Sequence, residues 1–407
     1  MDENSPVADL RGITRLAIDA TARMADLVEA VHENVERRVA PIAGPVHGPI
    51  RGIRLLVYGS VRGITRLTGA AIDVVLAQFA PLVGGQSTWP GRDVLLAALN
   101  GVLGDYLAAS GNPLATAMAL CYDGQRLQLD RKALAAAIPQ AGGKLAVLVH
   151  GLCMNDLQWT RLGQNYGASL SRDLGYTSVF LRYNSGCHIS TNGRAFAGAL
   201  EALVRQWPVP VRELTIIGHS LGGLVARSAC HYAKLQGQAW PRYLKKLVFI
   251  GTPHHGAPLE RGGHWVDLIL GGNPFTAPFA RLGKIRSAAI TDLRHGSLLD
   301  EDWEGRDRFE HSADHPRPVP LPEGVRCYAI AATTARQHAD LNGRLPGDGL
   351  VTVNSALGRH DDPARALPFP AARQWLAYGM NHMDLIGRAE VYEQIRQWLA
   401  EGPNPSS

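Results

Sequence analysis

The chain has 407 residues and a formal net charge of +5, with 46% hydrophobic and 19% charged residues. One hydrophobic core stops growing at roughly 250–300 residues, so we expect about 100 residues or more outside the main domain. The charge is mild for this length, and no zinc-finger, P-loop or dinucleotide-binding motif occurs. Composition and charge therefore favour a globular protein and do not predict binding to nucleic acid.

The cysteines and the start of the sequence predict a cytoplasmic protein. The five cysteines are an odd number and are well separated in the sequence, which favours reduced thiols. They are Cys121, Cys153, Cys187, Cys230 and Cys327. Residues 1–6 are acidic and polar, unlike a secretory signal, and no uninterrupted apolar run is long enough to span a bilayer.

Residues 1–85 are expected to form a helical hairpin that extends the main domain. Residues 11–38 have apolar side chains at steps of three or four, and a second helical pattern covers about residues 50–79. From Arg37 to Ile72, both included, there are six arginines and no acidic residue. Such a segment is suited to peripheral contact with an anionic membrane. The alternatives are packing on the main domain or on a second copy of the chain, as in a homodimer.

From residue 86 onward the pattern changes from helical to alternating. Residues 86–140 are interpreted as a helical connector, and residues 141–407 as an α/β domain. In that domain helical patterns separate short apolar runs at 145–150, 177–183, 214–217, 247–250, 326–332 and 375–378. This alternation predicts a mostly parallel sheet with helices on both faces. The stretch from about 258 to 322 has no clear strand and is expected to be a mostly helical cap insertion over the site.

A serine lies in a pattern that is typical of a catalytic nucleophile. Residues 218–222 read Gly-His-Ser-Leu-Gly, after an apolar strand pattern and before a helical one. A strand, a tight turn and a helix around Ser220 form the nucleophile elbow, which exposes the serine hydroxyl at the end of a sheet. The alternative is an ordinary turn in which Ser220 only caps the helix.

Three further elements complete the chemistry that Ser220 needs. Backbone N–H groups of Leu152, after the apolar run that ends at His150, and of Leu221 are the expected oxyanion donors. Asp348, between two glycines, is the expected acid, with Asp340 as its rival. His382 follows the last predicted strand and is the expected base. Such a Ser-His-Asp triad requires neither a metal nor a cofactor.

Three histidines follow predicted strand ends and are candidates for the wall of the substrate pocket. They are His150, His188 and His254. The alternative for each is a structural role in its loop.

Several motifs together resemble one family. They are Val149–Leu152, Gly218–Gly223, Gly251–Gly256, Asp348–Val351 and Asn381–Asp384. The sequence is similar over roughly residues 141–400 to bacterial lipases and esterases of the α/β-hydrolase superfamily, particularly those related to GPI-inositol deacylases.

This resemblance implies an α/β-hydrolase fold and hydrolysis of an ester with a hydrophobic acyl group, as in lipid metabolism. A thioesterase, an amidase and an intracellular polyester hydrolase would use the same triad. A membrane-associated interaction protein with a vestigial hydrolase domain is the alternative of another class. In many secreted relatives an aspartate two residues after the histidine helps to bind calcium, with a glutamine four residues later. Asp384 matches, but Arg388 replaces the glutamine and would repel calcium, so none is expected.

Overall fold

The computed structural model describes residues 92–257, 287–305, 316–336 and 346–401. The expected helical hairpin at 1–85, Asp340 and much of the expected cap insertion lie outside the described residues. Described residues 96–108 and 115–401 belong to one unit, whereas residues 92–95 and 109–114 belong to another. Helix α3 (Arg92–Ala109) includes residues of both units.

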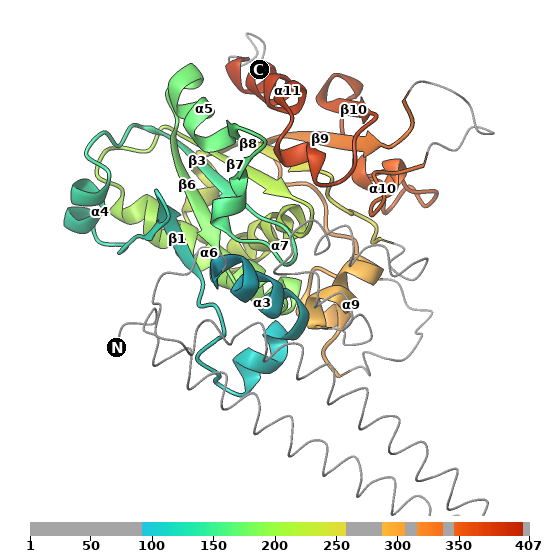
Figure 1. Cartoon of the computed structure of the whole chain (residues 1–407), viewed down its shortest axis with the longest axis horizontal. Coiled ribbons are helices and arrows are strands. Elements are labelled where there is room, and N and C mark those ends of the chain that lie inside the picture. Colours follow the sequence, from blue (N-terminus) through green and yellow to red (C-terminus); the bar gives the residue numbers. More distant parts are fainter. Residues whose placement is uncertain (1–91, 258–286, 306–315, 337–345, 402–407) are drawn as a thin grey trace, which may run out of the picture. The chain divides into compact units, whose positions relative to one another are not determined.

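A sheet of eight strands forms the centre of the larger unit (Figure 1). Its strand order in the described residues is β10-β9-β8-β7-β3-β6-β1-β2. The strands are β1 (Ala119–Tyr122), β2 (Gln125–Arg126), β3 (Lys144–Val149), β6 (Thr177–Arg182), β7 (Glu213–His219), β8 (Leu244–Ile250), β9 (Arg326–Thr333) and β10 (Gln374–Tyr378). All neighbours from β10 to β6 are parallel, and β1 and β2 are antiparallel.

Helices cover both faces of this sheet because its central strands are apolar on both sides. In β3, all five residues from Leu145 to Val149 have no exposed surface. Helices α5 (Tyr166–Leu174) and α11 (Ala389–Ala400) contribute to one core together with Ala146 and Leu148. Helices α6 (Ile189–Gln206) and α7 (Leu221–Leu235) pack against each other on the other face (Figure 1). The predicted α/β-hydrolase architecture, a mostly parallel sheet between two helical layers, is confirmed.

The expectation of a helical connector at 86–140 needs a correction. Helices α3 and α4 (Arg131–Ala137) lie there, but β1 and β2 form a hairpin that extends the main sheet through β6. Its two-residue turn is Asp123-Gly124, with φ angles of 47° and 73°. Asp-Gly is a strong signal for this type of turn. The flanking strands have only four and two residues, too few for a visible alternation of apolar and polar side chains.

The remaining described elements are short, apart from one helix in the expected cap insertion. Helix α9 (Ala288–His295) and the 3-10 turn η6 (Asp300–Asp302) lie in that insertion, whose described residues contain no strand. The others are η2 (Asp156–Trp159), β4 (Thr160–Arg161), β5 (Gln164–Asn165), η3 (Trp240–Tyr243), α10 (Val353–Ala356), η7 (Ala371–Arg373) and η8 (Asp384–Ile386).

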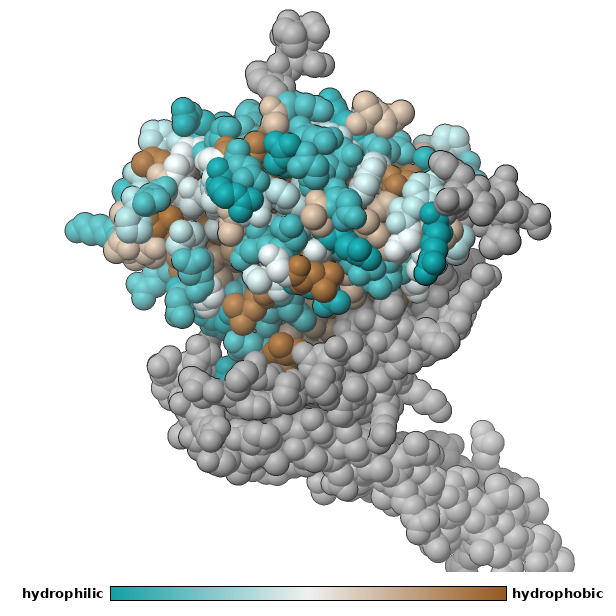
Figure 2. All heavy atoms as spheres, turned by 45° about the horizontal axis from the view of Figure 1, so that its top comes forward, coloured by the Kyte–Doolittle hydropathy of each residue, from teal (hydrophilic) through white to brown (hydrophobic). Residues whose placement is uncertain are grey.

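The described surface has the mixed character of a globular domain. On the face in Figure 2, apolar residues occur singly or in small groups among hydrophilic ones. In the part of the chain that the structure describes, no helix combines the length and the apolar character needed to cross a membrane.

Candidate active site

The candidate site lies where the order of the parallel strands reverses. After β3 the chain adds β6 on one side, and then returns to add β7 on the other side of β3. Loops that leave two such strands diverge, so a crevice opens at their carboxyl ends. The loop after β3 carries His150 to Leu152, and the turn after β7 carries Ser220. The strand order alone therefore brings the two segments that were expected to cooperate to the same edge of the sheet.

Ser220 occupies the tight turn between β7 and α7 in a strained backbone conformation. Its φ and ψ angles are 53° and −123°, which side-chain-bearing residues rarely adopt. A β-carbon at Gly218 would lie 2.6 Å from the Cα of Gly223, and one at Gly222 would lie 2.3 Å from the carbonyl oxygen of Val149. Both obstacles are backbone atoms, so the turn requires glycine on each side of Ser220. These are the two fixed glycines of the predicted nucleophile elbow.

Asp348 and His382 form a buried hydrogen-bonded pair. The Nδ1 of His382 lies 2.7 Å from Oδ2 of Asp348, and each side chain is 1% exposed. The other carboxylate oxygen, Oδ1, accepts hydrogen bonds from the N–H groups of Leu350 and Val351 at 2.9 and 2.8 Å. The backbone N–H of His382 also donates to the carbonyl oxygen of Asp348 at 3.0 Å. Four hydrogen bonds thus fix the carboxylate and the imidazole relative to each other.

The pairing determines which nitrogen of His382 is available for chemistry. A carboxylate only accepts hydrogen bonds, so Nδ1 carries the proton and Nε2 of the neutral ring has a lone pair. Nε2 is buried and has no hydrogen-bond partner in the described part of the chain. An unpaired buried acceptor is costly in an ordinary core and is expected in a site that awaits a substrate.

Three contacts place His382 next to the elbow. A β-carbon at Gly251, directly after β8, would lie 3.2 Å from Cε1 of His382. The last residue of β8, Ile250, accepts a hydrogen bond from the N–H of Ser220 at 2.8 Å. The ring of His219, which precedes Ser220, lies 4.8 Å from the ring of His382. Hydroxyl and imidazole are therefore held on adjacent segments, and in structures without substrate the bond between such groups is often long.

The turn after β3 lies against the elbow, as an oxyanion hole would require. A β-carbon at Gly151 would lie 3.1 Å from the Cβ of Ser220. Leu152 is buried, and its N–H has no acceptor among the described residues. Leu221 is the first residue of α7, and N–H groups in a first helical turn have no acceptor within the helix. Both expected donors thus remain candidates, on two segments that touch.

The three candidate pocket histidines have different surroundings. His150 is buried and stacks on Tyr183, with ring centroids 4.3 Å apart, and burial lowers its pKa to about 4. His188 stacks on Trp303 and bonds to Asp292 at 3.1 Å, which ties the start of α6 to α9. Each of these two rings therefore holds two segments of the domain together. His254 lines a described cavity beside α7.

Sequence reasoning did not single out His219, although the residue lies inside the serine motif. Its Nε2 lies 3.3 Å from the carbonyl oxygen of His382, and a carbonyl can only accept, so His219 donates. Burial lowers the pKa of His219 well below its usual range, which keeps the ring neutral. The only sequence signal was its place beside Ser220, and the pattern leaves that position open.

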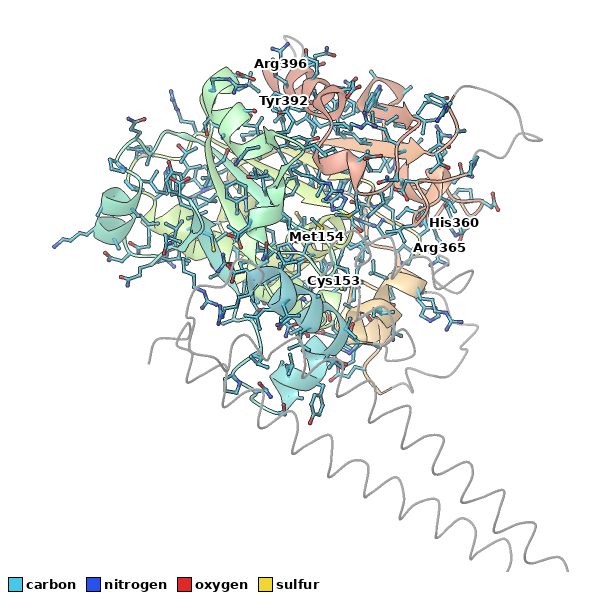
Figure 3. All side chains as sticks on the ribbon, in the orientation of Figure 1. Cys153, Met154, His360, Arg365, Tyr392 and Arg396 are labelled. Atoms are coloured by element: carbon cyan, nitrogen blue, oxygen red, sulfur yellow. The ribbon has the colours of Figure 1, made fainter. Side chains whose placement is uncertain are left out.

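All five cysteines lie within the described residues. All five cysteines are free, as expected, and burial raises the pKa of Cys153 to about 12. Cys153 lies close to α3 (Figure 3), where a β-carbon at Gly101 would meet its sulfur at 2.2 Å.

In the described segments no group of three or more His, Cys, Asp or Glu side chains could hold a metal ion. The Asp384 carboxylate accepts from the N–H of Asn381 at 3.0 Å and so shapes the loop of His382.

One known protein family matches the part of the chain that contains the elbow. Residues 140–317 match the PGAP1-like alpha/beta domain family. The match begins just before β3 and includes the elbow. Leu152, Ser220 and Leu221 lie within the matched residues, whereas Asp348 and His382 follow them in the sequence.

Solved structures with similar chains include three lipolytic enzymes. The lipase BlEst2 of Bacillus licheniformis is 17% identical over 70% of this chain and 98% of its own, with a TM-score of 0.42. Lipase B of Aspergillus fumigatus is 12% identical over 68% and 59%, with a TM-score of 0.41. Phospholipase PlaB of Legionella pneumophila is 16% identical over 64% and 60%, with a TM-score of 0.42. None of the curated proteins compared with the chain matches it.

Proposed function

We propose that this protein is a serine carboxylester hydrolase that acts through a covalent acyl-enzyme. The observation that carries the proposal is the strained turn at Ser220, with the buried His382–Asp348 pair held beside it. Strain of this kind persists only where the surrounding structure enforces it, and it is concentrated at functional sites. A serine that merely caps a helix needs no positive φ angle and no adjacent imidazole.

The reaction assigns one role to each group. Nε2 of His382 accepts the proton of the Ser220 hydroxyl as the oxygen attacks the ester carbonyl carbon. The carbonyl oxygen becomes an oxyanion, which the N–H groups of Leu152 and Leu221 stabilise. His382 then returns the proton to the leaving alcohol, and Asp348 stabilises the imidazolium in between. In the second half a water molecule gives a proton to His382 and attacks the acyl carbon. His382 then returns that proton to the departing oxygen of Ser220, so that the acid and the free serine are released.

The predicted substrate is an ester with a hydrophobic acyl group. Ester hydrolysis needs only the groups named above. The departing oxygen is protonated by His382, so the leaving group departs as a neutral alcohol. Thioester and amide hydrolysis would use the same residues. The acyl group and the leaving group of the substrate must therefore be identified by experiment. Peripheral contact with a membrane through residues 1–85 remains a proposal from the arginine-rich sequence.

The experiment is covalent labelling of the full-length protein with a fluorophosphonate, followed by a substrate panel. We expect stoichiometric labelling of wild-type protein at Ser220, located by peptide mass spectrometry, and none of Ser220→Ala. The panel contains p-nitrophenyl esters of increasing chain length, a matched thioester and a matched anilide. The proposal would be refuted by folded wild-type protein that is not labelled and hydrolyses none of these compounds. A strong preference for the thioester or the anilide would change the assigned substrate class from ester to thioester or amide.

A further inference from the structure

A cavity of about 140 Å³ beside α7 has an unusual set of charges in its wall. Among the described residues, three arginines and three histidines line it, and no aspartate or glutamate does so. They are Arg227, Arg317, Arg365, His254, His255 and His295. Neither Ser220, Asp348 nor His382 lines this cavity. Arg227 follows Ser220 by seven residues on the same helix, roughly 10 Å along its axis.

Within the described segments, Arg227 is a buried cation that has no carboxylate partner. It is 4% exposed, and no ion pair is formed by it among the described residues. Its guanidinium donates to the carbonyl oxygen of Val319 and lies 3.2 Å, through Nη1, from Nδ1 of His254. Its Nε–H is buried and has no partner in the described chain. Burial lowers the pKa of Arg227 only to about 10, so the group stays charged at neutral pH.

His254 provides a second buried donor without an acceptor. An arginine can only donate, so Nδ1 of His254 must accept from it. Burial lowers the pKa of His254 well below its usual range, so the ring is neutral and carries its proton on Nε2. That nitrogen is buried and unpaired in the described part of the chain. Two N–H donors at one cavity thus lack the acceptor that buried polar groups normally have.

Arg365 adds positive charge from the segment between α10 and β10. Figure 3 shows it on that segment near His360. It is half-buried and donates to the carbonyl oxygen of Pro316 at 3.3 Å, and within the described residues it forms no ion pair. Arg317, by contrast, lies 3.9 Å from Glu301 and is 69% exposed. The uncompensated charge therefore belongs mainly to Arg227 and Arg365.

We infer that this cavity binds a phosphate group, with Arg227 and His254 as its buried donors and Arg365 as a further cation. A phosphate supplies only acceptors and has oxygens in several directions, which suits donors that come from separate segments. Arginine is well adapted to such oxyanions because its guanidinium presents several N–H groups in one plane. Inorganic phosphate, a small phosphate ester and a phospholipid head group share this chemistry. The inference does not depend on the proposed esterase activity.

Binding of inorganic phosphate to the full-length protein tests it directly. We expect saturable binding by isothermal titration calorimetry and a rise in Tm beyond that given by sodium chloride of equal ionic strength. Arg365→Gln should weaken the affinity at least about tenfold, because a charge-assisted donor is lost. Arg227→Lys, which keeps the charge and loses the planar group, should do the same. Arg359→Gln is the matched control, since it removes the same charge from the same segment but outside the cavity wall.

Three results would overturn the inference. They are no saturable binding to wild-type protein, unchanged affinity in Arg365→Gln, and an equal loss in Arg359→Gln, which would mean attraction by net charge alone. Circular dichroism will show whether Arg227→Lys folds. If it does not, the phosphate affinities of Arg365→Gln and Arg359→Gln still test the inference. Competition by glycerol 3-phosphate and by monomeric dihexanoyl phosphatidylglycerol then distinguishes the sources. Tighter binding of the phospholipid indicates a head group, and tighter binding of either smaller compound indicates a soluble phosphate.

Discussion

The Nε2–H of His219 donates a hydrogen bond to the backbone carbonyl of His382 at 3.3 Å. The residue directly before the elbow serine therefore holds the loop that carries the expected base. Nε2 of His382 must reach the Ser220 hydroxyl, and a loop error of about 1 Å can cost a hundredfold in rate. Because the ring of His219 is neutral and bonds to the backbone of His382, its expected role is to position His382.

Replacement of His219 tests this positioning role. We expect His219→Ala to lower kcat about five- to tenfold with little change in KM, since one hydrogen bond contributes about 1 kcal/mol. His219→Gln keeps a side-chain donor and should recover part of the loss. Fluorophosphonate labelling rates should fall in parallel with kcat. Identical kinetics of both variants would argue against the hydrogen bond as the cause.

Asp348→Asn distinguishes the expected acid from its rival. The amide oxygen can still accept from Leu350 and Val351, but its NH₂ group then faces Nδ1 of His382 and favours the wrong tautomer. In serine proteases the corresponding change lowers kcat about 10⁴-fold. Asp340→Asn is the matched control and should be mild. The measurement is ester hydrolysis by folded variants, and a severe Asp340→Asn with a mild Asp348→Asn would transfer the role to Asp340.

The parts of the site that are local in sequence were predictable. The elbow needs glycines at fixed positions around a serine, and the structure gives the reason, because β-carbons at Gly218 and Gly222 would collide with backbone. The parallel strands were predictable too, since a strand buried on both faces is an uninterrupted apolar run. The segments around Asp348 and His382 could be placed at strand ends, and strand ends of a parallel sheet share one edge.

Features that depend on contacts between distant segments could not be read from the sequence. The bond from His219 to the carbonyl of His382 joins residues 163 positions apart. The pair of His188 with Asp292 joins α6 to the insertion. The sequence around either residue contains no signal that predicts its partner. The hairpin of β1 and β2 was missed for another reason. Its Asp123-Gly124 turn was visible, but its strands are too short to show a period.

The buried histidines predict a loss of stability in mild acid. Burial lowers the pKa of His150 to about 4, against 6.5 in an unfolded chain. The unfolded state therefore binds more protons between those values, so stability rises with pH across this window and is lost as pH falls through it. For His150 the effect is on the order of 2–3 kcal/mol.

Urea unfolding at a series of pH values between 4 and 7 measures this dependence. His150→Gln should flatten the slope, whereas His360→Gln, which removes an only partly buried ring, should leave it nearly unchanged. Parallel curves for wild-type protein and His150→Gln would show that His150 is not responsible for the acid sensitivity.

Two glycine-to-alanine substitutions should affect stability in opposite directions. At Gly222 the new β-carbon would lie 2.3 Å from the carbonyl oxygen of Val149 and 2.5 Å from that of His150, so α7 and β3 would have to separate. We expect Gly222→Ala to destabilise the domain by more than about 3 kcal/mol, as overpacking against rigid backbone does, and to abolish activity.

Gly198 lies in the interior of α6 with nothing within 4 Å of a β-carbon. Gly198→Ala should stabilise the domain by about 0.4–1 kcal/mol, because alanine restricts the unfolded chain and favours helix. Urea unfolding of both variants under one set of conditions checks the pair, and a stable, active Gly222→Ala would contradict the close approach of the elbow to β3 on which the proposed oxyanion hole depends.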